Sequence, residues 1–270
     1  MSLVVVRAAG LVTVQDLGRP GRMHEAVPPG GALVQGRLIA ANRAVQNPDD
    51  APAIEVLGNL VIRAEQALQV ATDTSSPRTL AAGDEFAVTS EPRRVAYLAV
   101  RGGISAPLVL GGRGTLLCAG LGGLLRAGQR FTGAGLAVVA SRPLPAERAA
   151  GPIRLLVGPD PDHFAPGALE LLVSSEYRIL PSSNRVGTRL DGPALPRTGA
   201  PEVSRPMVIG ALEVPRDGKP IVLGPEHPTT GGYPIVAVVA AEDLGRLFSI
   251  RLGGTVRFTG TFPTDETSVR

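Results

Sequence analysis

Glycine and proline limit what this chain can fold into more than any other feature of its sequence. Among 270 residues there are 34 glycines and 25 prolines, without the glycine at every third position that marks collagen. Both residue types interrupt helices, glycine because it loses more backbone entropy and proline because it lacks an N–H donor. The sequence therefore excludes a fold of long helices and predicts short elements joined by frequent turns.

Runs of apolar and β-branched residues fill the intervals between these turn residues. They recur at roughly 8–12-residue spacing, which is typical of all-β sandwiches and barrels. The strands predicted in the first half are Leu3–Val6, Leu11–Val14, Ile54–Val56, Leu60–Ile62, Leu68–Ala71, Glu85–Val88, Val95–Val100 and Leu136–Val139. Those predicted in the second half are Ile153–Val157, Met207–Ile209, Ala211–Val214, Ile221–Leu223, Ile235–Ala240 and Thr255–Phe258. We expect a hairpin around Gly58 and Asn59.

Three short helices accompany the strands. Leu33–Gln46 carries apolar residues at helical spacing and is stopped by an Asn-Pro pair. A second helix is predicted to begin with Asp160 as its N-cap and to end at about Val173, and a third covers Ala241–Phe248. The sequence thus predicts a mainly β fold with a few short helices.

The segment Ser141–Pro152 divides the chain into two halves of similar kind. It is rich in proline and alanine and has no periodicity, which is typical of a linker. We therefore predict two domains, residues 1–145 and residues 152–270. The runs Ala53–Ile62 and Ala211–Leu223 look alike, which favours a duplication of one small β domain.

Composition and charge exclude several classes of function. The net charge is +3, aromatic residues make up 3% of the chain, and Arg93–Arg94 is the one adjacent arginine pair. Because nucleic-acid-binding proteins cluster their cations and stack bases on aromatic rings, we expect no nucleic-acid partner. No apolar run approaches the roughly 20 residues that span a membrane. No leader segment opens the chain either, so we expect a cytoplasmic protein with its single Cys118 buried.

Several common catalytic motifs are missing from the sequence. Lys219 follows a glycine but precedes Pro220, unlike the Ser or Thr of a phosphate loop, and there is no G-x-S-x-G elbow or paired CxxC. The three histidines, His24, His163 and His227, have no ligand spacing, so we expect no metal site.

Two polar, glycine-bearing segments of the first half are candidate sites. In Thr13–Gly21, either Asp16 and Arg19 pair to stiffen a turn, or Arg19 holds a carboxylate or phosphate while Gln15 binds an amide. The second segment, residues 101–123, has eight glycines. It is either a string of tight turns or an anion nest in which Arg113 takes part.

Two further candidates lie in the second half. Asn184 and Arg185 precede a glycine in a predicted turn. Pro228–Pro234 gathers Thr229, Thr230, Gly231, Gly232 and Tyr233 in one loop. That loop is either a bulged hairpin corner or a pocket wall, whose hydroxyls, glycine amides and phenol would act as hydrogen-bond donors.

Five segments occur in an order that resembles one known family. They are TVQDLGRPG at Thr13–Gly21, GALVQGRLIAANRAVQN at Gly31–Asn47, YLAVRGGI at Tyr97–Ile104, SNRVGTRL at Ser183–Leu190 and GKPIVL…TTGGYP at Gly218–Pro234. Together they are similar to the allophanate hydrolase subunit 2 family, also called the biotin-dependent carboxyltransferase or KipA-like family. The similarity covers nearly the whole chain.

The resemblance implies two cyclophilin-like β-barrel domains and a role in amide chemistry. The first function that it implies is that of the C subunit of an ATP-dependent 5-oxoprolinase. This enzyme opens 5-oxoproline to glutamate, and the chain would act in it with a subunit 1 (KipI-like) partner and an A subunit. ATP would be bound by the complex rather than by this chain alone. Two alternatives stay open. One is the carboxyltransferase of a biotin-dependent urea carboxylase or allophanate hydrolase system, with carboxybiotin on a partner. The other is a KipA-like regulator that binds a histidine-kinase inhibitor.

Under the enzyme hypothesis the candidate residues take the following roles. Arg19 and Arg185 would hold the anionic activating group. The threonines of the TTGGYP loop and its two glycine amides would stabilise oxyanion charge, with Asp16 or Glu226 as general base. Because neither loop offers a full set of donors and acceptors, we expect the Gln15–Arg19 and Thr229–Tyr233 loops to face one pocket.

Three positions depart from the pattern that the family resemblance implies. Val34 stands where Asp is common, Gln46 where Gly is common, and Ile235 where Arg or Lys is common. We expect the losses of an acid and a cation to bear on the choice of substrate.

Overall fold

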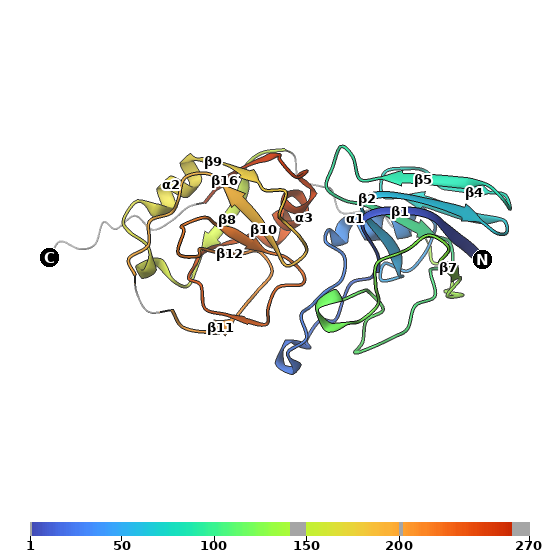
Figure 1. Ribbon diagram of the computed structural model, residues 1–270, viewed down its shortest axis with the longest axis horizontal. Coiled ribbons are helices and arrows are strands. Elements are labelled where there is room, and N and C mark those ends of the chain that lie inside the picture. Colours follow the sequence, from blue (N-terminus) through green and yellow to red (C-terminus); the bar gives the residue numbers. More distant parts are fainter. Residues whose placement is uncertain (1, 141–149, 200–201, 261–270) are drawn as a thin grey trace. The chain divides into compact units, whose positions relative to one another are not determined.

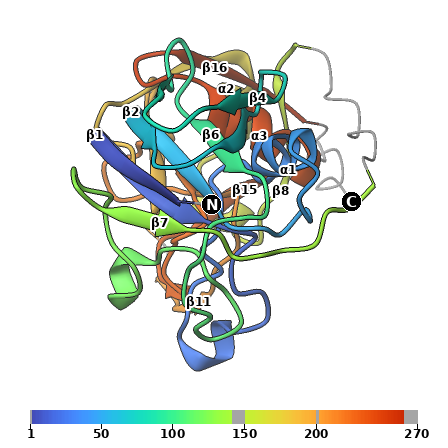
Figure 2. The same cartoon turned by 90° about the vertical axis from the view of Figure 1, so that its right-hand side faces the viewer.

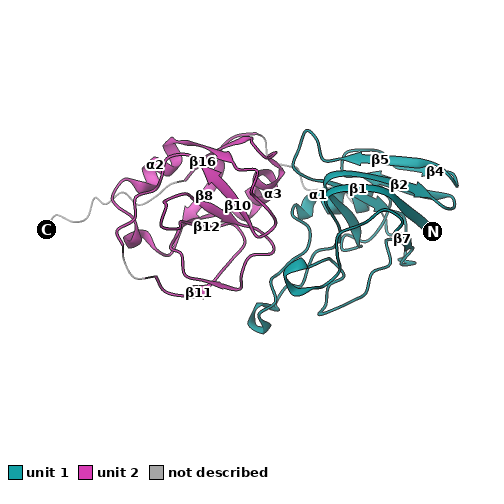
Figure 3. Ribbon diagram, viewed as in Figure 1, with its two compact units in different colours: residues 1–147 teal, residues 148–270 magenta. Residues whose placement is uncertain are grey.

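The computed structural model describes residues 2–140, 150–199 and 202–260 (Figure 1). The chain forms two compact units, residues 1–147 and residues 148–270 (Figure 3). Most of the predicted linker Ser141–Pro152 lies outside the described residues, and the domain boundaries stay a prediction.

The first unit is built on one seven-stranded sheet. Its strands are β1 (Ser2–Gln15), β2 (Ala53–Ala64), β3 (Leu68–Thr72), β4 (Arg78–Leu80), β5 (Glu85–Thr89), β6 (Ala96–Val100) and β7 (Arg130–Thr132). They follow the order β4-β3-β6-β2-β1-β7, and β2, β1 and β7 can be followed side by side in Figure 2. The long β2 also pairs with β5, beyond the part of it that pairs with β6.

Two long strands replace the shorter ones that the sequence predicts. β1 and β2 pair without interruption from Leu3 opposite Ala64 to Gln15 opposite Ala53, with one bulge after Val5. The predicted hairpin at Gly58 is therefore wrong. Gly58 lies opposite Gly10 inside the ladder, and both have positive φ, 133° and 93°. Each of these glycines is a turn signal in the sequence, yet each lies inside a continuous strand pair. There the two glycines let the backbones approach closely.

Apolar side chains from both long strands form the core of the first unit. Members of this core include Leu3, Val12, Ile54, Leu60, Ile62, Val70, Leu98 and Ile104. The helix α1 (Gln35–Ala44) lies against β6 and β3 and buries Leu38 and Ala41. The predicted helix Leu33–Gln46 is confirmed, with shorter ends. Gln46 has φ 60°, a conformation that glycine adopts without strain, which explains physically why glycine suits this position.

The second unit is a closed barrel of seven strands. They are β8 (Ile153–Val157), β9 (Glu176–Ile179), β10 (Gly187–Asp191), β12 (Ala211–Glu213), β13 (Ile221–Leu223), β15 (Ile235–Val239) and β16 (Thr255–Thr259). The order is β10-β13-β12-β15-β8-β16-β9, and only β8 and β16 pair in parallel. A separate pair joins β11 (Arg205–Pro206) to β14 (Thr230–Gly231). The mainly β fold class is confirmed. Its barrel closes in this unit, whereas the first unit's sheet has β4 and β7 at its ends.

Short helices complete both units. They are α2 (Ala168–Ser174) and α3 (Ala241–Ser249), with 3₁₀ turns η1 (Met23–Glu25), η2 (Leu117–Ala119) and η3 (Pro161–His163). The predicted helix Ala241–Phe248 is confirmed, and the buried Asp243 fastens it by accepting hydrogen bonds from Arg154 N and Nε at 2.9 Å. In the described part of the chain no helix is both long and apolar enough to cross a membrane.

Asp160 does not begin one continuous helix, as the sequence predicts. The chain leaves η3 at Phe164, which bridges to Arg197, and α2 begins only after Gly167 at φ 84°. The Asp160 carboxylate instead accepts a hydrogen bond from Ile235 N at 2.8 Å and pairs with Arg205 at 2.7 Å. Its partners are tertiary, so the local capping signal misleads.

Three further expectations differ from the structure. Two of the predicted strands do not form, namely Leu136–Val139 and Met207–Ile209. The strands β7 and β11 precede these two segments in the sequence. The similar runs Ala53–Ile62 and Ala211–Leu223 fold differently, the first as part of one strand and the second as the hairpin of β12 and β13. Their similarity therefore does not support a duplication.

The paired glycines of β1 and β2 generate a stability prediction. A Cβ on Gly58 would lie 2.2 Å from the Ala9 carbonyl oxygen, a distance that backbone atoms cannot tolerate. We expect Gly58→Ala to lower the free energy of unfolding by at least about 2 kcal/mol, through overpacking and strain at positive φ. Urea denaturation measures this change.

Gly36 provides the matched control for that substitution. It lies on the exposed face of α1, with nothing within 4 Å of a built Cβ. Gly36→Ala should stabilise the chain by about 0.5–1 kcal/mol. Equal effects of the two substitutions would show that the close approach at Gly58 is unimportant.

Candidate functional site

The first candidate region lies where β1 ends. Gln15, Asp16 and Arg19 are all buried there. The Asp16 carboxylate accepts hydrogen bonds from Gly18 N at 2.8 Å and from the backbone N of Arg113 at 2.5 Å. It therefore ties the turn after β1 to the glycine-rich segment of residues 101–123.

Arg19 makes the same connection with its guanidinium. It donates to the carbonyl oxygens of Val109 at 3.0 Å, Gly112 at 3.3 Å and Gly114 at 2.9 Å. The expected pairing of Asp16 with Arg19 is not what forms, because each binds backbone of the glycine-rich segment. A Cβ on Gly114 would lie within 2.8 Å of Gln15 Oε1, so only glycine fits there.

Two polar atoms of this region are left without partners. Gln15 Oε1 and Arg19 Nη1 are buried and accept or donate no hydrogen bond within the described residues. The Gln15 Nε2 group donates to Thr13 Oγ1 at 3.1 Å and to the Thr115 carbonyl at 3.2 Å, which fixes where Oε1 points. One acceptor and one donor thus remain for a ligand or water.

The glycine-rich segment carries two side chains that the sequence analysis singled out. The exposed Arg113 donates to the Ala106 carbonyl, so its cation already has a backbone partner. Its proposed part in an anion site stays a prediction. Cys118 is exposed rather than buried, because the chain turns through η2 at the surface.

A buried polar network beside this region escaped the sequence analysis. Glu55 on β2 is fully buried, and its Oε2 accepts from Tyr97 Oη at 2.6 Å and from Leu33 N at 2.7 Å. Tyr97 Oη accepts in turn from Val34 N at 2.9 Å. The network fixes the residues that lead into α1. Its one sequence signal is a glutamate inside an apolar strand.

Arg185 and Glu226 form the centre of the second candidate region. Both are buried, at 2% and 6% exposed, and Arg185 Nε lies 2.7 Å from Glu226 Oε1. Glu226 N also donates to the Arg185 carbonyl at 3.1 Å. The structure therefore brings together two predicted site residues from distant segments. Asn184 beside them accepts from Val186 N and Gly187 N, which builds the turn into β10.

The TTGGYP loop forms a strand rather than a simple hairpin corner. Thr230 and Gly231 make up β14, and Met207 N donates to the Thr229 carbonyl at 3.1 Å. Thr230 and Tyr233 are exposed, and a Cβ on Gly232 would meet nothing within 4 Å. The loop thus presents a hydroxyl, a phenol and open space at a glycine.

Two of the residues that depart from the family pattern lie in the interior of the fold. Val34 and Ile235 are both buried, at 4% and 3% exposed. Ile235 packs with Met207, Ala211 and Leu223, and its backbone N binds Asp160. These two apolar side chains therefore serve packing in this chain.

His227 is a buried group that the sequence analysis did not select. It has no exposed surface, and its Nδ1 lies 2.7 Å from the Pro228 carbonyl oxygen. Nε2 has no hydrogen-bond partner among the described residues. Burial lowers the pKa of this imidazole below its ordinary value of 6.5.

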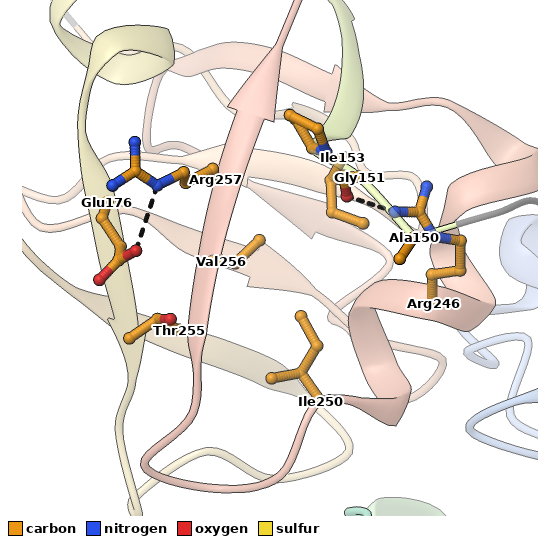
Figure 4. A pocket seen from close by; sticks show the side chains of 10 residues that line it. Ala150, Gly151, Ile153, Glu176, Arg246, Ile250, Thr255, Val256 and Arg257 are labelled. Atoms are coloured by element: carbon orange, nitrogen blue, oxygen red, sulfur yellow. Dashed lines mark hydrogen bonds and ion pairs between the residues drawn. The ribbon is translucent and has the colours of Figure 1, made fainter.

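A pocket of about 480 Å³ lies elsewhere on the second unit (Figure 4). Apolar side chains of Ile153, Ile250 and Val256 contribute to its lining, and Arg257 at one side of it pairs with Glu176 on the neighbouring strand at 3.1 Å. None of the predicted site residues lines it. Arg246 also donates to the Gly151 carbonyl, so both arginines of this lining already have a partner.

The described residues include no group of three or more His, Cys, Asp or Glu side chains that could hold a metal ion. The Gln15–Arg19 loop belongs to the first unit and the Thr229–Tyr233 loop to the second. A pocket shared by these two loops stays a prediction.

The buried ion pair generates a stability prediction. Glu226→Gln would leave Arg185 as a buried cation without its carboxylate, and we expect a loss of about 3–5 kcal/mol in the free energy of unfolding. The exposed pair of Arg257 and Glu176 gives the control, since Glu176→Gln should change stability by less than about 1 kcal/mol. Similar losses from both substitutions would contradict the assigned burial.

The lowered pKa of His227 generates a pH prediction. The unfolded chain takes up a proton on this side chain near pH 6.5, whereas the folded chain resists it until a lower pH. The stability contributed by neutral His227 is therefore fully present above pH 6.5 and is lost as the pH falls toward the folded pKa. We expect His227→Gln to weaken the loss of melting temperature between pH 7.5 and pH 5.5. His24→Gln, at a 74% exposed side chain, should leave that loss unchanged.

Comparison with proteins of known sequence identifies the family to which this chain belongs. A family model described as the carboxyltransferase domain, subdomain A and B, matches residues 25–260. The C subunit of 5-oxoprolinase from Escherichia coli (strain K12) is 32% identical, over 95% of this chain and 90% of its own length. The protein of the same name from Haemophilus influenzae is 30% identical over 91% and 87%. A urea amidolyase from Lachancea kluyveri is 29% identical over 94% of this chain but 16% of its own length.

Solved structures with a similar fold support the same family. The crystal structure of TTHA0988 superposes with a TM-score of 0.84 at 29% identity, over 96% of this chain. This chain spans about half, 55%, of the TTHA0988 chain. The Kluyveromyces lactis urea carboxylase shares the fold, with a TM-score of 0.86 at 23% identity over 97% of this chain and 27% of its own. The resemblance drawn from the sequence motifs is thereby confirmed: the chain belongs to the carboxyltransferase domain, subdomain A and B, family.

Proposed function

We propose that this chain is the C subunit of a 5-oxoprolinase, an ATP-dependent enzyme that opens 5-oxoproline to glutamate. The similarity to the Escherichia coli protein of that name supports this most, because it covers 95% of this chain and 90% of the relative. The two chains are therefore alike from end to end rather than in one shared domain. The chain would act with a separate subunit 1 (KipI-like) partner and an A subunit.

A second candidate function is carboxyl transfer to urea in a biotin-dependent urea carboxylase or allophanate hydrolase system. The family's description as a carboxyltransferase domain and the similarity to urea amidolyase favour it. In that case the carboxyl group arrives on carboxybiotin carried by a partner. A KipA-like regulator that binds a histidine-kinase inhibitor is the third alternative, without chemistry of its own.

Both enzymatic candidates act on a small amide. Opening of 5-oxoproline proceeds by attack on the amide carbonyl carbon, whereas in carboxyl transfer a urea nitrogen attacks the carboxyl carbon of carboxybiotin. In the first case negative charge develops on the amide oxygen, which donors in a fixed position would stabilise. The TTGGYP loop supports this role, because Thr230 is exposed and open space adjoins Gly232. Thr229, Gly231 and Tyr233 flank these two groups. We assign this loop to the carbonyl end of the substrate.

The carboxylates selected from the sequence are both engaged in the folded chain. Asp16 accepts two backbone N–H bonds, and Glu226 is paired with Arg185. Either would have to give up such a bond to take a proton from water or substrate. A general base from the partner protein therefore fits the structure better than one from this chain alone.

The arginines selected from the sequence are poorly suited to bind a nucleoside triphosphate. Arg19 and Arg113 already donate to backbone carbonyls, and Arg185 to Glu226. The unpaired donor Arg19 Nη1 and the unpaired acceptor Gln15 Oε1 would suit one amide rather than a chain of phosphates. We therefore place ATP on the complex and not on this chain alone.

Reconstitution tests this function. We expect the isolated chain to be inactive with ATP and 5-oxoproline, and a mixture with both the subunit 1 partner and the A subunit to release glutamate, which is measured directly. Thr230→Ala should lower that turnover by about 10-fold or more, which corresponds to about 1.4 kcal/mol of transition-state stabilisation. Because Thr230 is exposed, the Thr230→Ala variant should have the same melting temperature as the unaltered chain. Full turnover by the isolated chain would contradict the proposal.

Thr259→Ala is the matched control, since Thr259 is an exposed threonine on β16 of the same unit. It should retain the turnover of the unaltered complex. Arg19→Ala is less suitable as a probe. Arg19 is buried and holds three carbonyls, so its removal lowers stability together with activity.

A further inference from the structure

His227 has a buried nitrogen that the fold leaves unused. The side chain has no exposed surface, and it lies directly before the TTGGYP loop. Its Nδ1 is 2.7 Å from the Pro228 carbonyl oxygen, which can only accept a hydrogen bond. The proton of the neutral ring is therefore on Nδ1, and Nε2 carries a lone pair.

The surrounding segment satisfies its other buried side-chain polar atoms among the described residues. Glu226 pairs with Arg185, His227 N donates to the Gly224 carbonyl at 3.2 Å, and the Thr229 carbonyl accepts from Met207 N. Nε2 of His227 is the exception, since it has no partner in the parts of the chain that the structure describes. A buried acceptor without a donor costs free energy, and such atoms concentrate where a ligand or an ordered water completes the site.

The chemistry of the missing partner follows from the chemistry of the loop. Thr229, Thr230 and the glycine amides of Gly231 and Gly232 supply donors, which suit the carbonyl oxygen of an amide. A secondary amide also has an N–H, which needs an acceptor. In this unit His227 Nε2 is an acceptor that no described residue engages.

We propose that His227 Nε2 accepts the hydrogen bond of the substrate's amide N–H and so makes His227 a specificity-determining residue of the second unit. This inference rests on the proposed function. It goes beyond that function by assigning recognition of the N–H to one atom, and by requiring an amide that retains a hydrogen on nitrogen.

Access to Nε2 requires the loop that follows it to shift. Pro228, Thr230 and Tyr233 are exposed, and β14 is held to β11 by a pairing of only two residues. Open space adjoins Gly232. A substrate would therefore have to displace this segment, which the β11 pairing and the bond from Met207 N to the Thr229 carbonyl hold in place, without opening the barrel.

Discrimination between two amides tests the inference. In the reconstituted complex, kcat/KM would be measured for 5-oxoproline and for N-methyl-5-oxoproline, which lacks the N–H. We expect the unaltered complex to prefer 5-oxoproline by about 10-fold or more, because the N-methyl compound leaves Nε2 unpaired. His227→Asn keeps a donor for the Pro228 carbonyl but removes the Nε2 acceptor, and it should reduce that preference to nearly 1. His24→Asn, at an exposed histidine, should retain it.

Nitrogen NMR of the unaltered complex gives a second readout that does not depend on a variant folding. The ¹⁵N signal of His227 Nε2 should shift when 5-oxoproline is added and stay in place when the N-methyl compound is added. If the complex turns over 5-oxoproline while His227→Asn keeps the full preference, or while the Nε2 signal does not respond, the role of His227 is overturned and the proposed function stands. If the complex turns over no 5-oxoproline, both are overturned.

Discussion

The uninterrupted pairing of β1 with β2 is the constraint on which the first unit depends. It sets the register of the whole sheet, since β2 also pairs with β5 and β6 and β1 with β7. A slip of one residue would turn every core side chain to the opposite face. The same ladder delivers Gln15 and Asp16 to the end of β1, where the glycine-rich segment meets them. The candidate site of this unit is thus a direct product of strand register.

The second unit relies on buried charges where the first relies on a long ladder. Its barrel strands are short, three to five residues each, so the barrel offers little length on which to fix its loops. Asp160 holds Ile235 and Arg205, and Glu226 holds Arg185. Buried pairs such as these are costly to break, although they add little net stability over apolar packing. Their effect here is to fix where the segments around β11 and β14 lie.

The sequence predicts the class of fold and most strands well, because alternation of apolar residues and turn residues is local information. It fails where a local signal has a distant partner. Gly58 reads as a turn, yet its partner is Gly10 on another strand, and Asp160 reads as a helix cap, yet it binds Ile235. The candidate site shows the same limit. The motifs select loops that carry buried polar groups, but the pairing of Arg185 with Glu226 and the orphan nitrogen of His227 depend on tertiary contacts that no spacing encodes.

The distribution of used and unused polar atoms supports the proposal that this chain acts together with partners. Carboxylates that could act as bases are engaged in holding loops, as Asp16 and Glu226 show. Among the buried atoms left over within the described residues are Gln15 Oε1, Arg19 Nη1 and His227 Nε2. These can recognise an amide or a carboxylate, but none of them is placed to supply both activation and proton transfer. Recognition of substrate by this chain, with activation contributed by another protein of the complex, is the division of labour that such an arrangement favours.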